Sequence, residues 1–284
     1  MRVEQFPRPG RKVQASELVM TSGGQSGNAA VAIARLGART LYAGAMGGSD
    51  DDTASRIVTA MEREGVDCSG AVRVPDAMSS VSLILLDAAG EKMIATRRDK
   101  GLNDIAPNDA AALVAQADGV LADNRYPAFC VPICKAARDK RIPRVLDFDK
   151  PTPFDDALLR LSTHVIASAD ALREATGRTD LAEGLREMGR HLDCFLAVTD
   201  GPAGYDWLES GEVRHADAFR VDAVDTLGAG DAFHGVFTLR LVETGNAVEA
   251  LRYASAAAAI KCTRFGGLTG GATRAEVEAF LREH

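Results

Sequence analysis

From about residue 100 onward, short apolar runs alternate with longer segments whose apolar residues recur every three or four positions. Short apolar runs are typical of buried strands, and the wider spacing predicts amphipathic helices. The alternation favours a three-layer αβα fold of the α/β class, in which helices cover both faces of a mainly parallel sheet. Functional groups are then expected at the carboxyl ends of the strands. The predicted strands are 119–122, 144–148, 164–167 and 195–199, and the predicted helices are 108–116, 129–138, 169–176 and 181–191.

Two strand-like segments, 12–21 and 71–98, interrupt this alternation because no helical segment separates their apolar runs. Within the second, 81–86 and 92–96 flank a polar turn at 87–91, which predicts a β-hairpin. We therefore expect a small β-sheet that projects as a lid, suited to cover a ligand or to pair with a second subunit. A solvent-facing meander without a role is the alternative. The expected division is a body of residues 22–70 and 99–284 and a lid of residues 1–21 and 71–98.

Composition indicates a protein with a substantial core, since 46% of the 284 residues are hydrophobic and 26% are charged. The net charge of −7 argues against a surface that coats nucleic acid, which needs clustered Lys and Arg. No apolar run approaches the roughly 20 residues that cross a bilayer, and the first residues lack the apolar stretch of a signal peptide. The five cysteines form no CxxC pair, so free thiols in a reducing cytoplasm are expected. We expect a cytoplasmic protein without a nucleic-acid or membrane partner.

The strongest local signal is the sequence VDTLGAGDAF, which begins at residue 224. Its small residues let the backbone of 228–230 approach a ligand closely, and a long helical run, 232–243, follows. The unpaired amides and the dipole at the start of a helix attract an anion such as a phosphoryl group. Asp231 would there accept a proton from an attacking hydroxyl. Taken alone, the motif is explained equally well if Asp231 only complements the helix dipole.

This motif resembles the DTxGAGD signature of the ribokinase-like (PfkB) carbohydrate kinases, and two further motifs support the resemblance. The sequence GGQSGNAA at 23–30, followed by ARLG at 34–37, is similar to the sugar-binding GG motif of that family. The sequence VTDGPAG at 198–204 is similar to the family's VTxGxxG strand end. The three motifs occur in the family's order and at its separations, so the resemblance covers nearly the whole chain. The overall pattern is most similar to the branch that contains sulfofructose kinase.

The resemblance implies ATP-dependent phosphorylation of a hydroxyl on a small sugar or sugar acid, with Asp231 as the general base. It implies that Gly228, Ala229 and Gly230 form an anion hole for the transferred phosphate. Because 254–260 is rich in alanine, plain helix packing would explain the presence of Ser255 as well as a nucleotide contact does. The residues that the resemblance assigns to ATP are Thr199, Gly201, Gly204, Asp225, Thr226, Ser255 and Gly266.

The sugar site is implied to include the GG motif. Gly23 and Gly24 would act as the hinge of the lid, because glycine tolerates the dihedral changes of closure. Asn28 offers a donor and an acceptor to a polyol, although a helix cap is its alternative role. The residues that the resemblance assigns to the sugar are Gly23, Gly24, Asn28, Arg97, Arg125 and Asp231.

Arginines give the only clue to the charge of the substrate. Arg97 and Arg98 close a lid strand, and Arg125 follows a predicted body strand, in segments that the resemblance brings to the sugar. Arginine is suited to grip a carboxylate, phosphate or sulfonate. Solvated arginines, or arginines paired with Asp99 and Asp123, are the alternatives.

The resemblance also implies Mg²⁺, since a cation bridges the phosphate oxygens of the nucleotide, and it leaves room for a monovalent cation. The family's Asn-x-x-Glu motif is replaced here by Ser168 and Ala171. Asp147 and Asp149, at the end of a predicted strand, would then hold metal-bound water, or they are ordinary turn acids. The chain has no Walker A sequence and no GxGxxG after a strand, which argues against P-loop NTPases and Rossmann dehydrogenases.

Members of this family begin with a buried strand that ends in a sugar-binding Asp, and this chain starts roughly where that strand has finished. We therefore expect the first core strand of the fold to be missing. The expected partners are a small sugar and a second copy of the chain, bound through the lid. A sugar- or nucleotide-sensing protein without turnover is one alternative function, and a nucleoside kinase is another. His234, three residues beyond Asp231, is interpreted as a packed helical residue rather than a second base.

Overall fold

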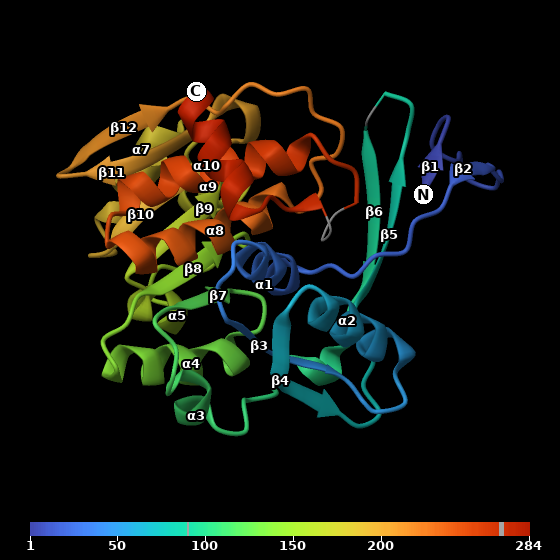
Figure 1. The fold of residues 1–284 in the computed structure, drawn as a ribbon, viewed down its shortest axis with the longest axis horizontal. Helices are drawn as coiled ribbons and strands as arrows, with labels where there is room; N and C mark the ends of the chain where they lie inside the picture. The colour runs from blue at the N-terminus through green and yellow to red at the C-terminus, as the bar shows by residue number, and fades with distance from the viewer. Residues whose placement is uncertain (90, 267–269) are drawn as a thin grey trace.

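The computed structural model describes residues 1–89, 91–266 and 270–284, and it places a six-stranded sheet between two layers of helices (Figure 1). Its strands are β7 (Val120–Asp123), β8 (Arg144–Phe148), β9 (His164–Ser168), β10 (Phe195–Thr199), β11 (Tyr205–Glu209) and β12 (Glu212–Ala216). They lie in the order β12-β11-β10-β9-β8-β7. The four strands from β7 to β10 run parallel, and β11 and β12 extend the sheet with antiparallel pairs.

Strands of the parallel part are buried on both faces. Val145 and Ile166 pack in one hydrophobic cluster, and their neighbours Leu146 and Val165 pack in another on the opposite face. This is why these strands read as continuous apolar runs in the sequence. The helices of the first cluster are α1 (Gln25–Arg35), α8 (Ala229–Thr244), α9 (Ala247–Cys262) and α10 (Arg274–Glu283), and those of the second are α4 (Pro127–Asp139), α5 (Ala157–Leu161), α6 (Ala169–Thr176) and α7 (Leu181–Gly189). In the described ranges, no helix is long and apolar enough to cross a membrane.

A second parallel pair, β3 (Thr40–Gly47) and β4 (Val66–Val74), forms a sheet of its own. Helix α2 (Asp52–Arg63) connects these strands. Within the described residues, no strand pairs with both β3 and β7, so the two sheets are separate and α1, which contacts both strands, joins them. The first core strand, which we expect to be missing, would belong at this junction between the two sheets, and its absence stays a prediction. The remaining short elements are η1 (Lys100–Leu102), α3 (Ala110–Val114) and η2 (Gly201–Ala203).

A lid of four strands stands away from the body in Figure 1. Its strands are β1 (Arg2–Val3), β2 (Ala15–Glu17), β5 (Val81–Leu86) and β6 (Lys92–Arg97), in the order β2-β1-β5-β6. The antiparallel pairing of β5 and β6 confirms the predicted hairpin, whose Gly90 lies outside the described residues. The predicted lid segment that begins at residue 71 includes the end of β4, which is paired with β3 in the body as far as Val74.

Candidate active site

Helices α1 and α8 bring Asn28 and Asp231 together. The helices approach closely at Gly235, where a Cβ atom would lie 2.5 Å from the carbonyl oxygen of Ala29. Asn28 Nδ2 donates a hydrogen bond of 2.6 Å to Asp231 Oδ2. The other amide atom of Asn28, Oδ1, is buried and has no hydrogen-bond partner in the described part of the chain. The predicted sugar-binding residue and the predicted base are thus in contact, and one buried acceptor is left unused.

The turn before α8 has the geometry of an anion site. Gly228 has a φ of 76°, a left-handed conformation that suits glycine, and α8 begins directly after it. The amide of Ala229 donates to Thr226 O at 3.3 Å, and the amide of Ala232 makes a helical bond of 3.0 Å to Gly228 O. The amides of Gly230 and Asp231 stand in the first turn, where helical geometry supplies no acceptor. The amide of Ala229, which was expected to belong to the anion hole, is thus engaged within the turn, and the binding of a phosphoryl group here stays a prediction.

Acidic side chains gather where β7 and β8 end. Asp123 and Asp147 are direct neighbours in the register of the two strands. Ser26 Oγ donates to Asp123 Oδ2 at 2.5 Å, and Gln25 Nε2 donates to Asp147 Oδ2 at 3.2 Å. The start of α1 is thereby tied to the carboxyl ends of the strands, where a parallel sheet is expected to place functional groups.

Carboxylates neutralise both arginines that were assigned to the sugar. Arg125 Nη2 pairs with Asp149 Oδ2, and Arg125 Nε donates to Gln25 Oε1. The guanidinium of Arg125 is thus paired with Asp149, whereas the backbone amide of Arg125 donates to Asp123 Oδ1 at 2.9 Å. On the exposed lid, Arg97 Nη2 lies 3.3 Å from Asp99 Oδ2. Neither charge is left unpaired for an anionic ligand.

Burial shifts two of the acids toward neutral pH. It raises the pKa of Asp147 from 3.8 to about 7, an effect that His234 opposes and that Asp231 and Asp123 reinforce. Burial is also the main cause that raises the pKa of Asp231, while the hydrogen bond from Asn28 opposes the change. A general base works best when its pKa lies near the operating pH, so the shift suits Asp231 to proton abstraction.

Apart from Thr199 at the end of β10 and Ser255 in α9, the predicted nucleotide residues lie in two loops. Gly204 has a φ of 100°, and a Cβ there would lie 2.2 Å from Ala216 O, so the connection after Thr199 needs glycine. In the second loop, Asp225 Oδ2 accepts from the amide of Gly266 at 3.3 Å and lies 3.6 Å from Lys261 Nζ. Lys261 is buried and also donates to Asp225 O at 2.8 Å. Of the remaining residues, Gly201 has a φ of 52°, Thr226 is exposed and Ser255 is buried in α9.

Three residues contact the acidic side chains of the predicted site although no motif assigned them a role: Gln25, Ser26 and Lys261. The position of Gln25 and Ser26, between the hinge glycines and Asn28, was the available signal in the sequence. For Lys261 the signal was its place at the end of a predicted helix that is otherwise rich in alanine and therefore suited to burial. A lysine is rarely buried without a partner, so a nearby acid was to be expected.

The acids of the site do not fit a direct metal site. Across the described ranges, no group of three or more His, Cys, Asp or Glu is arranged to hold a metal ion. Asp147 is enclosed by Gln25 and His234, and Asp149 is paired with Arg125. Mg²⁺ commonly keeps several waters and is held by one or two carboxylates together with substrate phosphates, so the water-mediated role expected of Asp147 and Asp149 stays a prediction. Ser168 caps α6 by accepting a bond of 3.3 Å from Ala171 N. Mg²⁺ and a monovalent cation therefore stay predictions.

Comparison with known proteins identifies the family. The family model described as pfkB family carbohydrate kinase matches residues 1–273. The chain belongs to the PfkB family. Both the expected family and the expected enzyme class, a carbohydrate kinase, are thereby confirmed, while similarity to the sulfofructose kinase branch stays a prediction.

Relatives of this PfkB kinase include ribokinases. It is 29% identical to the ribokinase of Bacillus subtilis over 280 residues, which cover 97% of this chain and 92% of the relative. It is 28% identical to the ribokinase of Haemophilus influenzae over 290 residues, 99% and 94% of the two chains. Among solved structures, a candidate ribokinase from Agrobacterium tumefaciens superposes with a TM-score of 0.93 and 36% identity, covering 99% of this chain and 93% of that one. This likeness confirms the three-layer ribokinase-like fold.

Proposed function

We propose that this kinase transfers the γ-phosphoryl group of ATP to a hydroxyl of ribose or a similar small, neutral sugar. The names of its relatives support this substrate class, since they include two ribokinases and a deoxyribokinase of Salmonella typhimurium. Pairing of Arg125 with Asp149 supports a neutral rather than an acidic sugar.

The observation that carries the proposal is the contact between Asn28 and Asp231. An unsatisfied buried acceptor costs about 1 to 3 kcal/mol, so Asn28 Oδ1 is expected to accept a hydrogen bond from a ligand. Asn28 Nδ2 is already bonded to Asp231 Oδ2, which fixes the carboxylate beside that acceptor. A polyol would place one hydroxyl on Asn28 and present a second to Asp231.

The chemistry follows from this placement. The acceptor hydroxyl donates its proton to the carboxylate of Asp231 while its oxygen attacks the γ-phosphorus, and the bond to the β-phosphate oxygen breaks. The amides of Gly230 and Asp231, at the start of α8, stabilise the charge on the transferred group. The products are ADP and the phosphorylated sugar, and the proton on Asp231 returns to solvent.

The nucleotide would occupy the loops after β10 and before α8. We assign it to the residues predicted from the resemblance, with Lys261 in addition as the side chain that holds Asp225 in place. Gly201 and Gly204 allow the first loop to turn tightly, and Gly228 does the same in the second.

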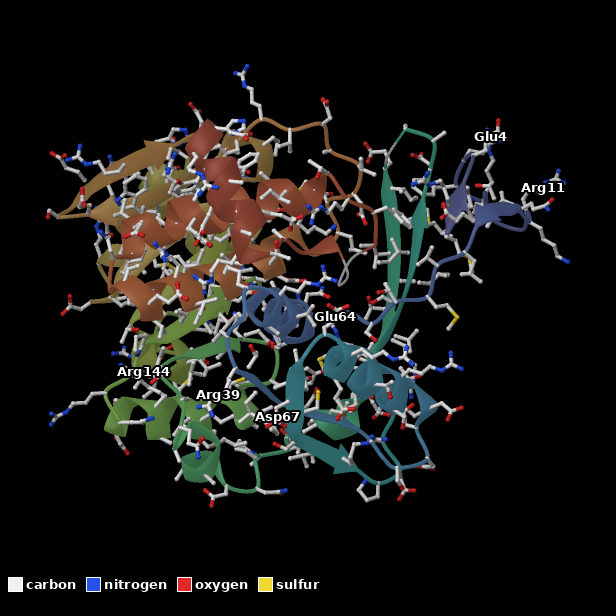
Figure 2. All side chains as sticks on the ribbon, in the orientation of Figure 1. Glu4, Arg11, Arg39, Glu64, Asp67 and Arg144 are labelled. Carbon is white, nitrogen blue, oxygen red and sulfur yellow. The ribbon has the colours of Figure 1, made fainter. Side chains whose placement is uncertain are left out.

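The lid would form a homodimer. Several of its apolar side chains are exposed, which favours contact with another molecule. Charged side chains such as Glu4 and Arg11 lie at its outer end, away from the body (Figure 2). The exposed apolar residues of the lid include Leu18, Met20, Val81, Leu83, Met93 and Ile94. Light scattering coupled to size exclusion tests this, with Ile94→Glu as the variant expected to give monomers.

ADP production with a panel of sugars tests the proposed activity. Ribose, deoxyribose and fructose are compared with their carboxylated relatives, and a reaction without sugar measures background ATP hydrolysis. The proposal expects sugar-dependent ADP release that is greatest with a neutral pentose. ADP release that does not depend on any sugar would contradict it.

A further inference from the structure

His234 lies one helical turn after Gly230, and only 4% of its surface is exposed. Its neighbours on α8, Phe233 and Val236, are core residues, so an apolar side chain would suit the position. The interpretation of His234 as a packed helical residue is confirmed by this burial. Burying an imidazole is nevertheless costly unless its ring nitrogens find partners.

Both ring nitrogens of His234 lie against oxygen atoms. Nδ1 is 2.7 Å from the carbonyl oxygen of Gly230, in the phosphate-binding turn. Nε2 is 3.2 Å from the carbonyl oxygen of Ile166 in β9 and 3.5 Å from Asp147 Oδ1 in β8. The ring thus bridges the first turn of α8 and the central sheet, and its tautomer decides which nitrogen is the donor.

Asp147 continues this path toward the sugar side. Its second oxygen, Oδ2, accepts from Gln25 Nε2 at 3.2 Å, and Gln25 in turn accepts from Arg125. Gln25 is the first residue of α1, directly after the hinge residue Gly24. Polar contacts therefore run without a break from Gly230, beside the base, to the start of the helix that carries Asn28.

We propose that His234 is a positioning residue that fixes the phosphate-binding turn relative to the start of α1, through Asp147 and Gln25. This rests on the proposed function, in which the two ends of the path hold the phosphoryl group and the sugar. Reacting groups must be aligned closely, and a misplacement of about 1 Å can lower a rate by about 100-fold. The path joins two helices that the sequence separates by about 200 residues, so it controls that alignment directly.

Two half-isosteric variants separate the contacts of His234. His234→Asn places an amide nitrogen near the position of Nδ1, and it keeps the contact with Gly230 only. His234→Gln reaches the position of Nε2 and keeps the contact with Asp147. Each variant keeps one end of the bridge and loses the other, so we expect both His234→Asn and His234→Gln to lower kcat by about 10- to 100-fold with little change in the KM for ATP.

Thr238→Val is the matched control. Thr238 is buried one turn further along α8, and its hydroxyl donates only to His234 O, at 2.8 Å. Thr238 belongs to no part of the proposed site, so the kcat of the Thr238→Val variant is expected to stay within about twofold of the wild-type value. Equal losses for His234→Asn, His234→Gln and Thr238→Val would mean that helix packing alone is being perturbed, and would overturn the proposal.

A double-mutant cycle of His234→Asn with Gln25→Met tests the path as a unit. If the path acts as one device, the double variant loses about as much kcat as the worse single variant, and losses that multiply would contradict it. The same double-mutant cycle can be measured as changes in the free energy of unfolding, which does not require an active enzyme. If the wild type phosphorylates no sugar, the proposed function fails, and the cycle in unfolding free energy alone tests the path. Non-additive losses of stability in the double variant support the path, and additive losses overturn it. If the wild type is active but His234→Asn matches it, only the positioning role fails.

Discussion

Asn28 Nδ2 lies 2.6 Å from Asp231 Oδ2, although 203 residues separate the two in the sequence. The contact gives the carboxylate a fixed orientation and leaves one buried amide oxygen without a partner in the described ranges. The glycine at 235 makes it possible, because any side chain there would push α8 away from α1. In the proposed function, this one pair of side chains both recognises the sugar and activates its hydroxyl.

Asn28→Ala should weaken sugar binding and slow the reaction together. Loss of the amide removes a ligand contact and lets the Asp231 carboxylate rotate, so kcat/KM for the sugar should fall by about 10- to 100-fold. The KM for ATP should change little. Asn246→Ala is the matched control, since Asn246 only caps α9 and its loss should cost about 1 kcal/mol of stability without a kinetic effect. Wild-type kinetics for Asn28→Ala would exclude Asn28 from the sugar site.

Arg125→Ala should not change the preference of the enzyme between neutral and acidic sugars. Arg125 is already paired with Asp149, and its removal leaves that carboxylate uncompensated. We expect kcat/KM to fall by a similar factor for ribose and for a carboxylated relative. Steady-state kinetics with both sugars measure this. A loss confined to the acidic sugar would restore Arg125 to the role of an anion grip, as the sequence first suggested.

Asp147 should make stability depend on pH. Its pKa is about 7 in the folded protein, against an ordinary value of 3.8 in an unfolded chain, so the folded state holds a proton that the unfolded chain releases. The contribution of this group is fully present below about pH 3.8 and is lost as pH rises through about 7. Between about pH 4 and about pH 8, the free energy of unfolding of the wild type should fall relative to that of Asp147→Asn.

Urea unfolding at several pH values measures this difference. Asp139→Asn serves as the control, because Asp139 is an exposed residue at the end of α4, and its curve should run parallel to that of the wild type. If the curve of Asp147→Asn is also parallel, Asp147 does not hold a proton in the folded state.

Gly235→Ala should destabilise the protein. The added Cβ meets the backbone of Ala29 at 2.5 Å, and a rigid helix backbone cannot move aside cheaply, so a loss of about 1 to 3 kcal/mol is expected. Gly189→Ala is the matched control. There the new Cβ also meets an atom at 2.5 Å, but that atom is the Cδ2 methyl of Leu208, which can rotate away. Thermal or urea unfolding should separate the two, and equal effects would contradict the packing argument.

Much of the fold could be predicted because its strands are apolar on both faces. The predicted bounds of β8 and β10 coincide with the observed strands, and the lid hairpin is correct. Local motifs also predicted the glycine turn that leads into a long helix at α8, while the functions assigned to its residues stay predictions. The partners of Arg125 and His234 could not be predicted, because side chains from separate strands and helices decide them. The two-part sheet likewise depends on pairing between distant segments, for which the sequence carries no local signal.

Replacement of Asp231 by Asn tests the central claim most directly. The amide keeps the shape of the side chain but cannot take the proton, so kcat should fall by about 10² to 10⁴-fold while the dissociation constant for ATP, measured by calorimetry, stays within about twofold. That combination would assign Asp231 to the chemical step. An unchanged kcat with the preferred sugar would remove Asp231 from the mechanism and contradict the account.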